Sequence, residues 1–182
     1  MTNIRNLSTL TKKIAPATPA VPPALSPLYL QSVQSLAAQL LRNPPAAASK
    51  PANITLFTGP DIAAKTAAAE ALASNLHREL YRVNLSTTTS NSLTQLLHTT
   101  DPGSVVLLFD EGDALFGKRT DIEDSHDRYA DESSGAPDGG NNLLQLLQQY
   151  PGIVILAVNS TNGCNPTLLA QTHATLKFPP TP

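Results

Sequence analysis

Short apolar runs alternate with amphipathic stretches over most of the chain beyond residue 52. The apolar runs predict five strands, at residues 54–58, 80–85, 105–110, 153–158 and 174–178. Apolar positions at helical spacing predict intervening helices at residues 65–76, 92–98, 142–150 and 166–171. Strands that are apolar on both faces and joined by helices are typical of a parallel sheet covered on each side. We therefore expect an α/β fold with three layers, α/β/α, around a five-stranded parallel sheet.

The N-terminal part of the chain has a different pattern, rich in proline and alanine. Residues 1–24 lack a periodic apolar face, so we expect a disordered, Pro-rich arm. Ser26 followed by Pro27 is typical of a helix start, and the apolar spacing beyond it predicts a helix over 27–42. The chain then divides into the arm (1–24), an N-terminal helix with a linker (25–51), and a core (52–180) with a mobile insertion at 131–141.

The composition excludes several classes of protein. The chain has 182 residues, of which 14% are charged, and a formal net charge of −2. This balance does not suit a nucleic-acid binder, which needs an excess of basic side chains. Cys164 is the one cysteine, so no intramolecular disulfide can form. No apolar run approaches the roughly 20 residues that span a bilayer, and we find no signal peptide, so we expect a cytoplasmic protein without membrane contact.

The residues after the first strand of the core match a phosphate-binding motif. The pattern G-x-x-x-x-G-K-[ST] is met at seven of its eight places, with Ala64 where the last glycine belongs. In the intact motif, backbone N–H groups at a helix N-terminus cradle phosphates, the lysine reaches their oxygens, and the hydroxyl binds Mg²⁺. The alternative is an ordinary helix start. The candidate nucleotide-binding residues are Gly59, Pro60, Asp61, Ile62, Ala63, Ala64, Lys65 and Thr66.

Polar residues also follow two other predicted strands. Asp110 is the last residue of the run at 105–110, and Glu111 comes directly after it. Asn159 follows the run at 153–158. Asp110 and Thr66 would hold Mg²⁺, Glu111 would orient or deprotonate the attacking water, and Asn159 would position that water. A capping acid and a turn-forming asparagine are the alternatives. Parallel sheets bind ligands beyond the carboxyl ends of their strands, so the three strand ends together favour an ATP site.

With these strand ends in order, residues 53–180 resemble the core domain of the AAA+ ATPases, a group of P-loop NTPases. Asp110 and Glu111 match that family's Walker B acids, and Asn159 matches its sensor 1. The segments that resemble the ATPases of phage-tail-like contractile injection systems lie at 56–60, 80–86, 108–119 and 124–130. The resemblance implies binding of ATP with Mg²⁺, hydrolysis coupled to assembly or remodelling of a protein complex, and a homo-oligomer, usually a hexamer ring.

Several features depart from the family pattern and imply hydrolysis that is slow at best. Ile62 and Ala64 replace glycines, and a positive φ at Ala64 would cost about 1–2 kcal/mol. Asp61 adds negative charge beside the expected triphosphate. No arginine follows Arg128, so the family's arginine fingers are absent from their usual place. The sequence ends at Pro182, so we also expect the family's helical lid to be missing.

Two interpretations therefore stay open. In the first, the chain is an ATP-binding module with hydrolytic ability and a protein partner, for which injection-system components are candidates. In the second, it is a degenerate homologue that keeps the fold and serves as a docking or assembly scaffold. The retained lysine, paired acids and asparagine favour the first interpretation, whereas the changed loop and absent arginines favour the second. The remaining acidic residues between 113 and 132 are expected to form a solvated face.

Overall fold

The computed structural model describes residues 11–14, 25–42, 52–85, 87–112, 139–162, 164 and 166–179. Its strands are β1 (Thr11–Ile14), β2 (Asn53–Thr58), β3 (Glu79–Asn84), β4 (Val105–Asp110), β5 (Ile153–Val158) and β6 (Thr172–Lys177). Its helices are α2 (Pro27–Arg42), α3 (Ile62–Asn75), α4 (Ser90–Thr99), α6 (Gly139–Gln149) and α7 (Pro166–Gln171). Strands and helices alternate from β2 onward, as the apolar pattern predicts.

The described strands form one sheet in the order β1-β3-β4-β5-β2-β6. All neighbouring strands from β3 to β6 run parallel, which confirms the predicted five-stranded parallel sheet. β1 adds a further, antiparallel strand at the edge beside β3. The sequence does not predict β1, because it lies among residues expected to form a disordered arm. In the sequence, prolines follow β1 from Pro16 onward, and proline near a strand is compatible with an edge position, where half of the backbone N–H groups need no partner.

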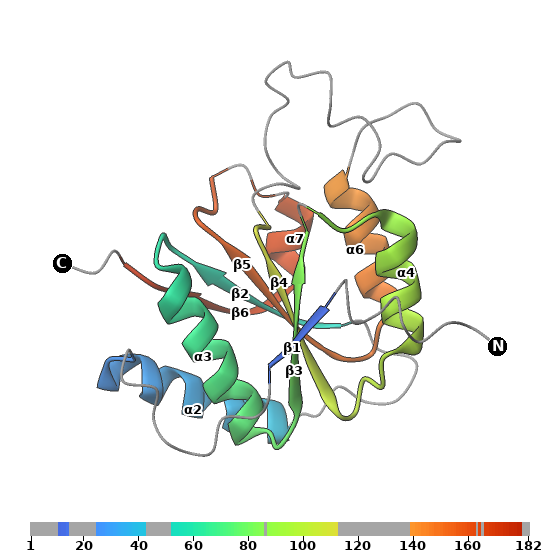
Figure 1. Ribbon diagram of the computed structural model, residues 1–182. Helices are drawn as coiled ribbons and strands as arrows, with labels where there is room; N and C mark the ends of the chain where they lie inside the picture. The colour runs from blue at the N-terminus through green and yellow to red at the C-terminus, as the bar shows by residue number, and fades with distance from the viewer. Residues whose placement is uncertain are drawn as a thin grey trace.

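Helices cover both faces of the sheet, so the fold has three layers (Figure 1). On one face, α2 and α3 pack against a cluster that includes Phe57, Leu108 and Ile155. On the other face, α4, α6 and α7 pack against a cluster that includes Leu107 and Leu156. Because β4 and β5 are buried along their whole length on both faces, they form the centre of the hydrophobic core. Among the described residues, no helix combines the length and apolar character needed to cross a bilayer.

The helix α2 is joined to the core by an aromatic stack. The ring of Tyr29 lies 5.0 Å from that of Phe178, and the Phe178 ring lies 5.2 Å from that of Phe57 on β2. Such pairs add about 0.5–1.5 kcal/mol beyond the burial of their apolar area. The Phe178 N–H also donates to the Thr58 carbonyl oxygen at 2.6 Å. This stack places the segment after β6 directly beside the end of β2, where the phosphate-binding motif begins.

Three helices begin two or three residues earlier in the chain than their apolar spacing predicts, and one of them is α4, which begins at Ser90 rather than at residue 92. α3 begins at Ile62 rather than at residue 65, because Asp61 caps it. α6 begins at Gly139, so residues 139–141 of the expected mobile insertion are helical, whereas residues 131–138 lie outside the described part of the chain. The acidic residues between 113 and 132 also lie outside it.

The strands β2, β4 and β5 bring their carboxyl ends to one edge of the sheet. Thr58 at the end of β2 is in register with Val158 at the end of β5. Asn84 at the end of β3 is in register with Asp110 at the end of β4. The residues that follow these strands are therefore neighbours in space, although they lie up to about a hundred positions apart in the sequence.

Candidate nucleotide site at the carboxyl edge of the sheet

The segment between β2 and α3 is short, and several backbone donors in it and in the first turn of α3 already have partners within the chain. The Gly59 N–H donates to the Val158 carbonyl oxygen at 3.1 Å, and Pro60 has no N–H. The Ala64 N–H donates to Oδ1 of Asp61 at 2.9 Å, and the Lys65 N–H donates to the Asp61 carbonyl oxygen at 3.1 Å. Asp61 therefore places its own carboxylate at the helix N-terminus where the intact motif receives a phosphate.

Ala64 does not carry the strain that the sequence suggests. It lies inside α3 and is buried, with 5% of its surface exposed. Among the described residues other than glycine, positive φ angles occur only at His77 and Glu111. The expected cost at Ala64 does not arise because the helix starts at Ile62, so the position is helical and an alanine fits it well.

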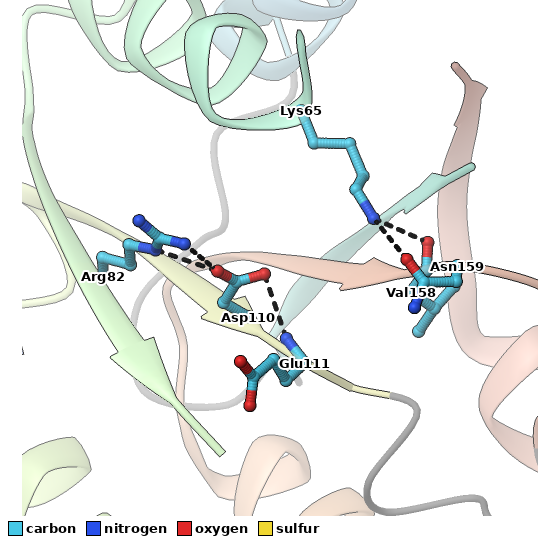
Figure 2. Close-up of polar contacts among 6 residues, drawn as sticks. All are labelled: Lys65, Arg82, Asp110, Glu111, Val158 and Asn159. Atoms are coloured by element: carbon cyan, nitrogen blue, oxygen red, sulfur yellow. Dashed lines mark hydrogen bonds and ion pairs between the residues drawn. The ribbon is translucent and has the colours of Figure 1, made fainter. Parts of the chain in front are cut away.

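Lys65 reaches across the edge of the sheet from α3 to β5. Its Nζ donates to the Val158 carbonyl oxygen at 3.0 Å and to Oδ1 of Asn159 at 3.4 Å. Only 3% of the Lys65 surface is exposed. Figure 2 shows the lysine chain descending from the first turn of α3 onto the end of β5. The structure thus brings together two of the residues that the sequence assigns to the site, Lys65 and Asn159.

Asp110 lies on the same face of the sheet as α3 and is paired with an arginine that the sequence analysis does not single out. Nε of Arg82 donates to Oδ2 of Asp110 at 2.9 Å, and Nη2 of Arg82 contacts the same oxygen (Figure 2). The other carboxylate oxygen, Oδ1, accepts the Glu111 N–H at 3.0 Å. Asp110 is 7% exposed, so its charge is balanced within the protein by a charge-assisted pair.

Glu111 adopts a backbone conformation that is unfavourable for a residue with a side chain. Its φ angle is 58°, in the left-handed region that costs about 1–2 kcal/mol for most residues. The Glu111 side chain is exposed, and its carboxylate points away from Lys65 and Asn159 (Figure 2). A carboxylate that activates water must lie within hydrogen-bond reach of it, so Glu111 has to turn toward the lysine before it can act on a phosphate bound there.

Mg²⁺ does not fit this arrangement at Asp110. Thr66 in α3 and Asp110 offer the hydroxyl and carboxylate oxygens that Mg²⁺ prefers. However, Oδ2 of Asp110 already holds the guanidinium of Arg82, and Oδ1 holds a backbone N–H. A metal ion at Oδ2 would have to displace the guanidinium, and a metal ion at Oδ1 would share that oxygen with the Glu111 N–H beside the positive charge of Arg82.

Arg82 is the residue of this site that sequence reasoning missed, although a signal for it exists. Alternate residues of a strand point to the same face, and Arg82 lies two positions before Asn84, which is in register with Asp110. An arginine near the end of the neighbouring strand could therefore have been placed beside Asp110. Which strand neighbours β4 on that side, however, depends on the order of the sheet, and the sequence alone does not give it.

Comparison with known proteins identifies the family that the sequence matches. Residues 55–179 match the ATPase family associated with various cellular activities (AAA). The matched range begins within β2 and ends just after β6, so it contains all of the candidate site residues from Gly59 to Asn159. No curated protein matches the sequence significantly.

Solved structures with the same fold include the two that follow. One chain comes from the complex of HORMA, CdnC and Trip13 from E. coli MS115-1. It superposes with a TM-score of 0.58 at 16% identity, over 94% of this chain and 70% of the other. Another comes from a study of katanin self-assembly, with a TM-score of 0.63 at 14% identity, over 97% of this chain and 58% of the other. The chain thus spans little more than half the length of the katanin chain, and the likeness concerns the fold.

Proposed function

The chain belongs to the AAA family of ATPases, and we propose that it binds ATP at the carboxyl edge of its sheet and hydrolyses it slowly at best. The contact of Lys65 with Asn159 carries this proposal, because it joins the phosphate-binding segment to the end of β5. A lysine at the first turn of a helix after a buried strand is placed to meet phosphate oxygens. Bound triphosphate would take this lysine from the Val158 carbonyl oxygen, a weaker acceptor than a charged oxygen.

The proposed roles of the remaining residues follow from their places around the lysine. The segment from Gly59 to Thr66 would contact the phosphates, and Asn159 would position the attacking water. Glu111 would take the proton of that water once its carboxylate turns toward Lys65. Three features support slow turnover: the negative charge of Asp61 at the helix N-terminus, the outward direction of Glu111, and the lack of arginines after residue 128.

The biological setting is also a proposal. We propose that nucleotide binding controls the assembly or remodelling of a protein complex and that the chain forms homo-oligomers. The two neighbouring structures support this, since one is a complex of three proteins and the other concerns self-assembly. The sequence segments resembling the ATPases of contractile injection systems support partners from such systems, in the cytoplasm. Two of these segments lie largely outside the described residues.

Calorimetric titration of the chain with ATP in the presence of Mg²⁺ tests the proposal. We expect a dissociation constant in the micromolar range, and loss of binding in Lys65→Ala. The matched control is Lys177→Ala, which removes an exposed lysine from the edge strand β6 and should bind ATP like the wild type. Equal ATP affinity of Lys65→Ala and the wild type would contradict the proposed site.

The second candidate is a scaffold that keeps the AAA fold without using nucleotide. The contacts of Asp61 and Arg82 favour it, because these two side chains occupy the helix N-terminus and the Asp110 carboxylate from within the chain. The same titration separates the two functions, since a scaffold of this kind would bind no ATP at millimolar concentration.

A further inference from the structure

The pairing of Arg82 with Asp110 differs from an ordinary surface ion pair. Arg82 uses two adjacent N–H groups, Nε and Nη2, on the single oxygen Oδ2 of Asp110. The carboxylate side chain is 9% exposed, whereas the Arg82 side chain is 33% exposed. The acid is thus held inside the protein, whereas part of the Arg82 side chain is accessible to solvent. Such partly buried, hydrogen-bonded pairs are much harder to separate than exposed ones.

The position of the pair matters because it lies beside the proposed phosphate site. Asp110 and Lys65 are brought to the same edge of the sheet from β4 and α3, and Figure 2 shows Arg82 and Lys65 on either side of Asp110. A carboxylate at this place repels phosphate unless a cation balances it. Mg²⁺ would balance it in a metal-dependent site, but here a guanidinium that stays protonated at all physiological pH values already does so.

Arg82 can also contribute more than charge balance. A guanidinium carries five N–H groups, and those on Nη1 have no hydrogen-bond partner in the described ranges of the chain. The fork of an arginine matches two phosphate oxygens, which is why arginine is widely used to bind phosphate. One arginine could therefore hold Asp110 through Nε and Nη2 and present its remaining face to a polyphosphate.

We propose that Arg82 takes the place of the metal ion at this site, so that the chain binds the polyphosphate of ATP equally well with and without Mg²⁺. This inference rests on the proposed function, since it concerns the same nucleotide site. The ligand is the polyphosphate anion without bound metal. The positive charges that face it are the ammonium of Lys65 and the guanidinium of Arg82, and Asp110 keeps the latter in position.

The test is a pair of ATP titrations of the full chain, one in excess Mg²⁺ and one in EDTA. For the wild type we expect dissociation constants that differ by less than about threefold between the two conditions. Arg82→Gln should weaken metal-free binding at least about tenfold, since a charge-assisted contact is lost, and Mg²⁺ should restore part of the loss. Arg42→Gln is the matched control, because it removes an exposed arginine from the last turn of α2 and should behave like the wild type in both conditions.

Arg82→Lys is the second test variant, for use if Arg82→Gln does not fold, because it keeps a positive charge at this position of β3. Its metal-free affinity should stay within about tenfold of the wild type. Wild-type binding that needs Mg²⁺ would overturn this inference and leave the proposed ATP site standing. Tight metal-free binding by folded Arg82→Gln would overturn it as well. Wild-type protein that binds ATP in neither condition would overturn both the inference and the proposed function.

Discussion

The carboxylate of Asp61 caps α3, with 2.9 Å between its Oδ1 and the backbone nitrogen of Ala64. This contact satisfies a helix donor that would otherwise need another partner, and it favours the start of α3 at Ile62. It also places a negative charge where the family's motif receives a phosphate. Asp61 therefore stabilises the helix and weakens the binding of a phosphate at its N-terminus, and substitutions can separate these two effects.

Asp61→Asn should tighten ATP binding with little loss of stability. The amide oxygen can still accept the Ala64 N–H, and asparagine caps helices about as well as aspartate, so the free energy of unfolding should fall by less than about 1 kcal/mol. Removing the negative charge should raise the ATP affinity about tenfold. Calorimetric titration and urea unfolding measure the two quantities on the same preparation.

Asp61→Ala is the companion variant, because it removes both the charge and the cap. It should gain a similar ATP affinity but lose about 1 kcal/mol of unfolding free energy. An Asp61→Asn chain with unchanged ATP affinity would show that this carboxylate does not face the bound phosphates, and the account of the helix N-terminus would be wrong.

Glu111→Gly should stabilise the protein while it removes turnover. Glycine adopts a φ of 58° without strain, so the free energy of unfolding should rise by about 1 kcal/mol. The loss of the carboxylate should bring ATP hydrolysis to the background rate, because Glu111 is the residue proposed to take the proton of the attacking water. Urea unfolding and a phosphate-release assay are the two measurements.

His77→Gly provides the matched control for that strain. His77 follows the C-cap residue Leu76 of α3 and has a φ of 54°, but it lies at the opposite end of the helix from the site. It should give a similar gain in stability with unchanged nucleotide binding and turnover. If Glu111→Gly were less stable than the wild type while His77→Gly were more stable, Glu111 would be making contacts that outweigh its strain.

Much of the fold can be predicted from the sequence because it depends on local apolar patterns. The runs at 105–110 and 153–158 are apolar at nearly every position, which is typical of strands that are covered on both faces. β1 could not be predicted, since Thr11–Ile14 is short and has no apolar alternation of its own. Its place depends on pairing with β3, a long-range contact that no local pattern records.

The sequence predicts which residues of the candidate site lie at the ends of the strands, but not all of the contacts that they make. Lys65 and Asn159 are brought together because parallel strands share one carboxyl edge, which follows from the fold class. The pair of Arg82 with Asp110 depends on β3 and β4 being neighbours in a particular register. The start of α3 could not be predicted from the motif either. The motif suggested a loop as far as Ala64, whereas in the structure Asp61 caps the helix and α3 begins at Ile62.

Tyr150 lies on the face of the sheet that is opposite to α3. Replacing it in Tyr150→Phe should remove a loss of folding stability that occurs at high pH. Burial raises the pKa of the Tyr150 hydroxyl to about 12, whereas an unfolded tyrosine titrates near pH 10. The folded state therefore disfavours the charged form. Stability is full below pH 10 and falls as the pH rises from 10 to 12, by about 1.4 kcal/mol per pH unit.

Urea unfolding of the wild type and Tyr150→Phe at pH 7, 10 and 11 measures this effect. At pH 7 the variant should be as stable as the wild type or up to about 1 kcal/mol more stable, because the buried hydroxyl has no hydrogen-bond partner within the described part of the chain. Above pH 10 the difference in favour of phenylalanine should grow. Parallel curves for the two proteins up to pH 11 would contradict the assignment to Tyr150.

Gly59→Ala should destabilise the fold itself, whatever it does to nucleotide binding. Gly59 has a φ of 133°, which side chains rarely allow, and a Cβ there would overlap the carbonyl oxygen of Phe178. The Phe178 backbone cannot retreat easily, because its N–H is bonded to the Thr58 carbonyl oxygen and its ring packs against the rings of both Tyr29 and Phe57. The strain and the overlap together should cost about 3 kcal/mol or more.

The control is Gly103→Ala, where an added Cβ would approach the side chain of Asp101, with Oδ1 nearest at an ordinary 3.4 Å. That exposed turn should change the free energy of unfolding by less than about 0.5 kcal/mol. Thermal and urea unfolding of both variants, without nucleotide, separate a role in the fold from a role in ligand binding. If Gly59→Ala unfolds like the wild type in the absence of ATP, the close approach to Phe178 does not require this glycine. The residue would then serve the phosphate site alone.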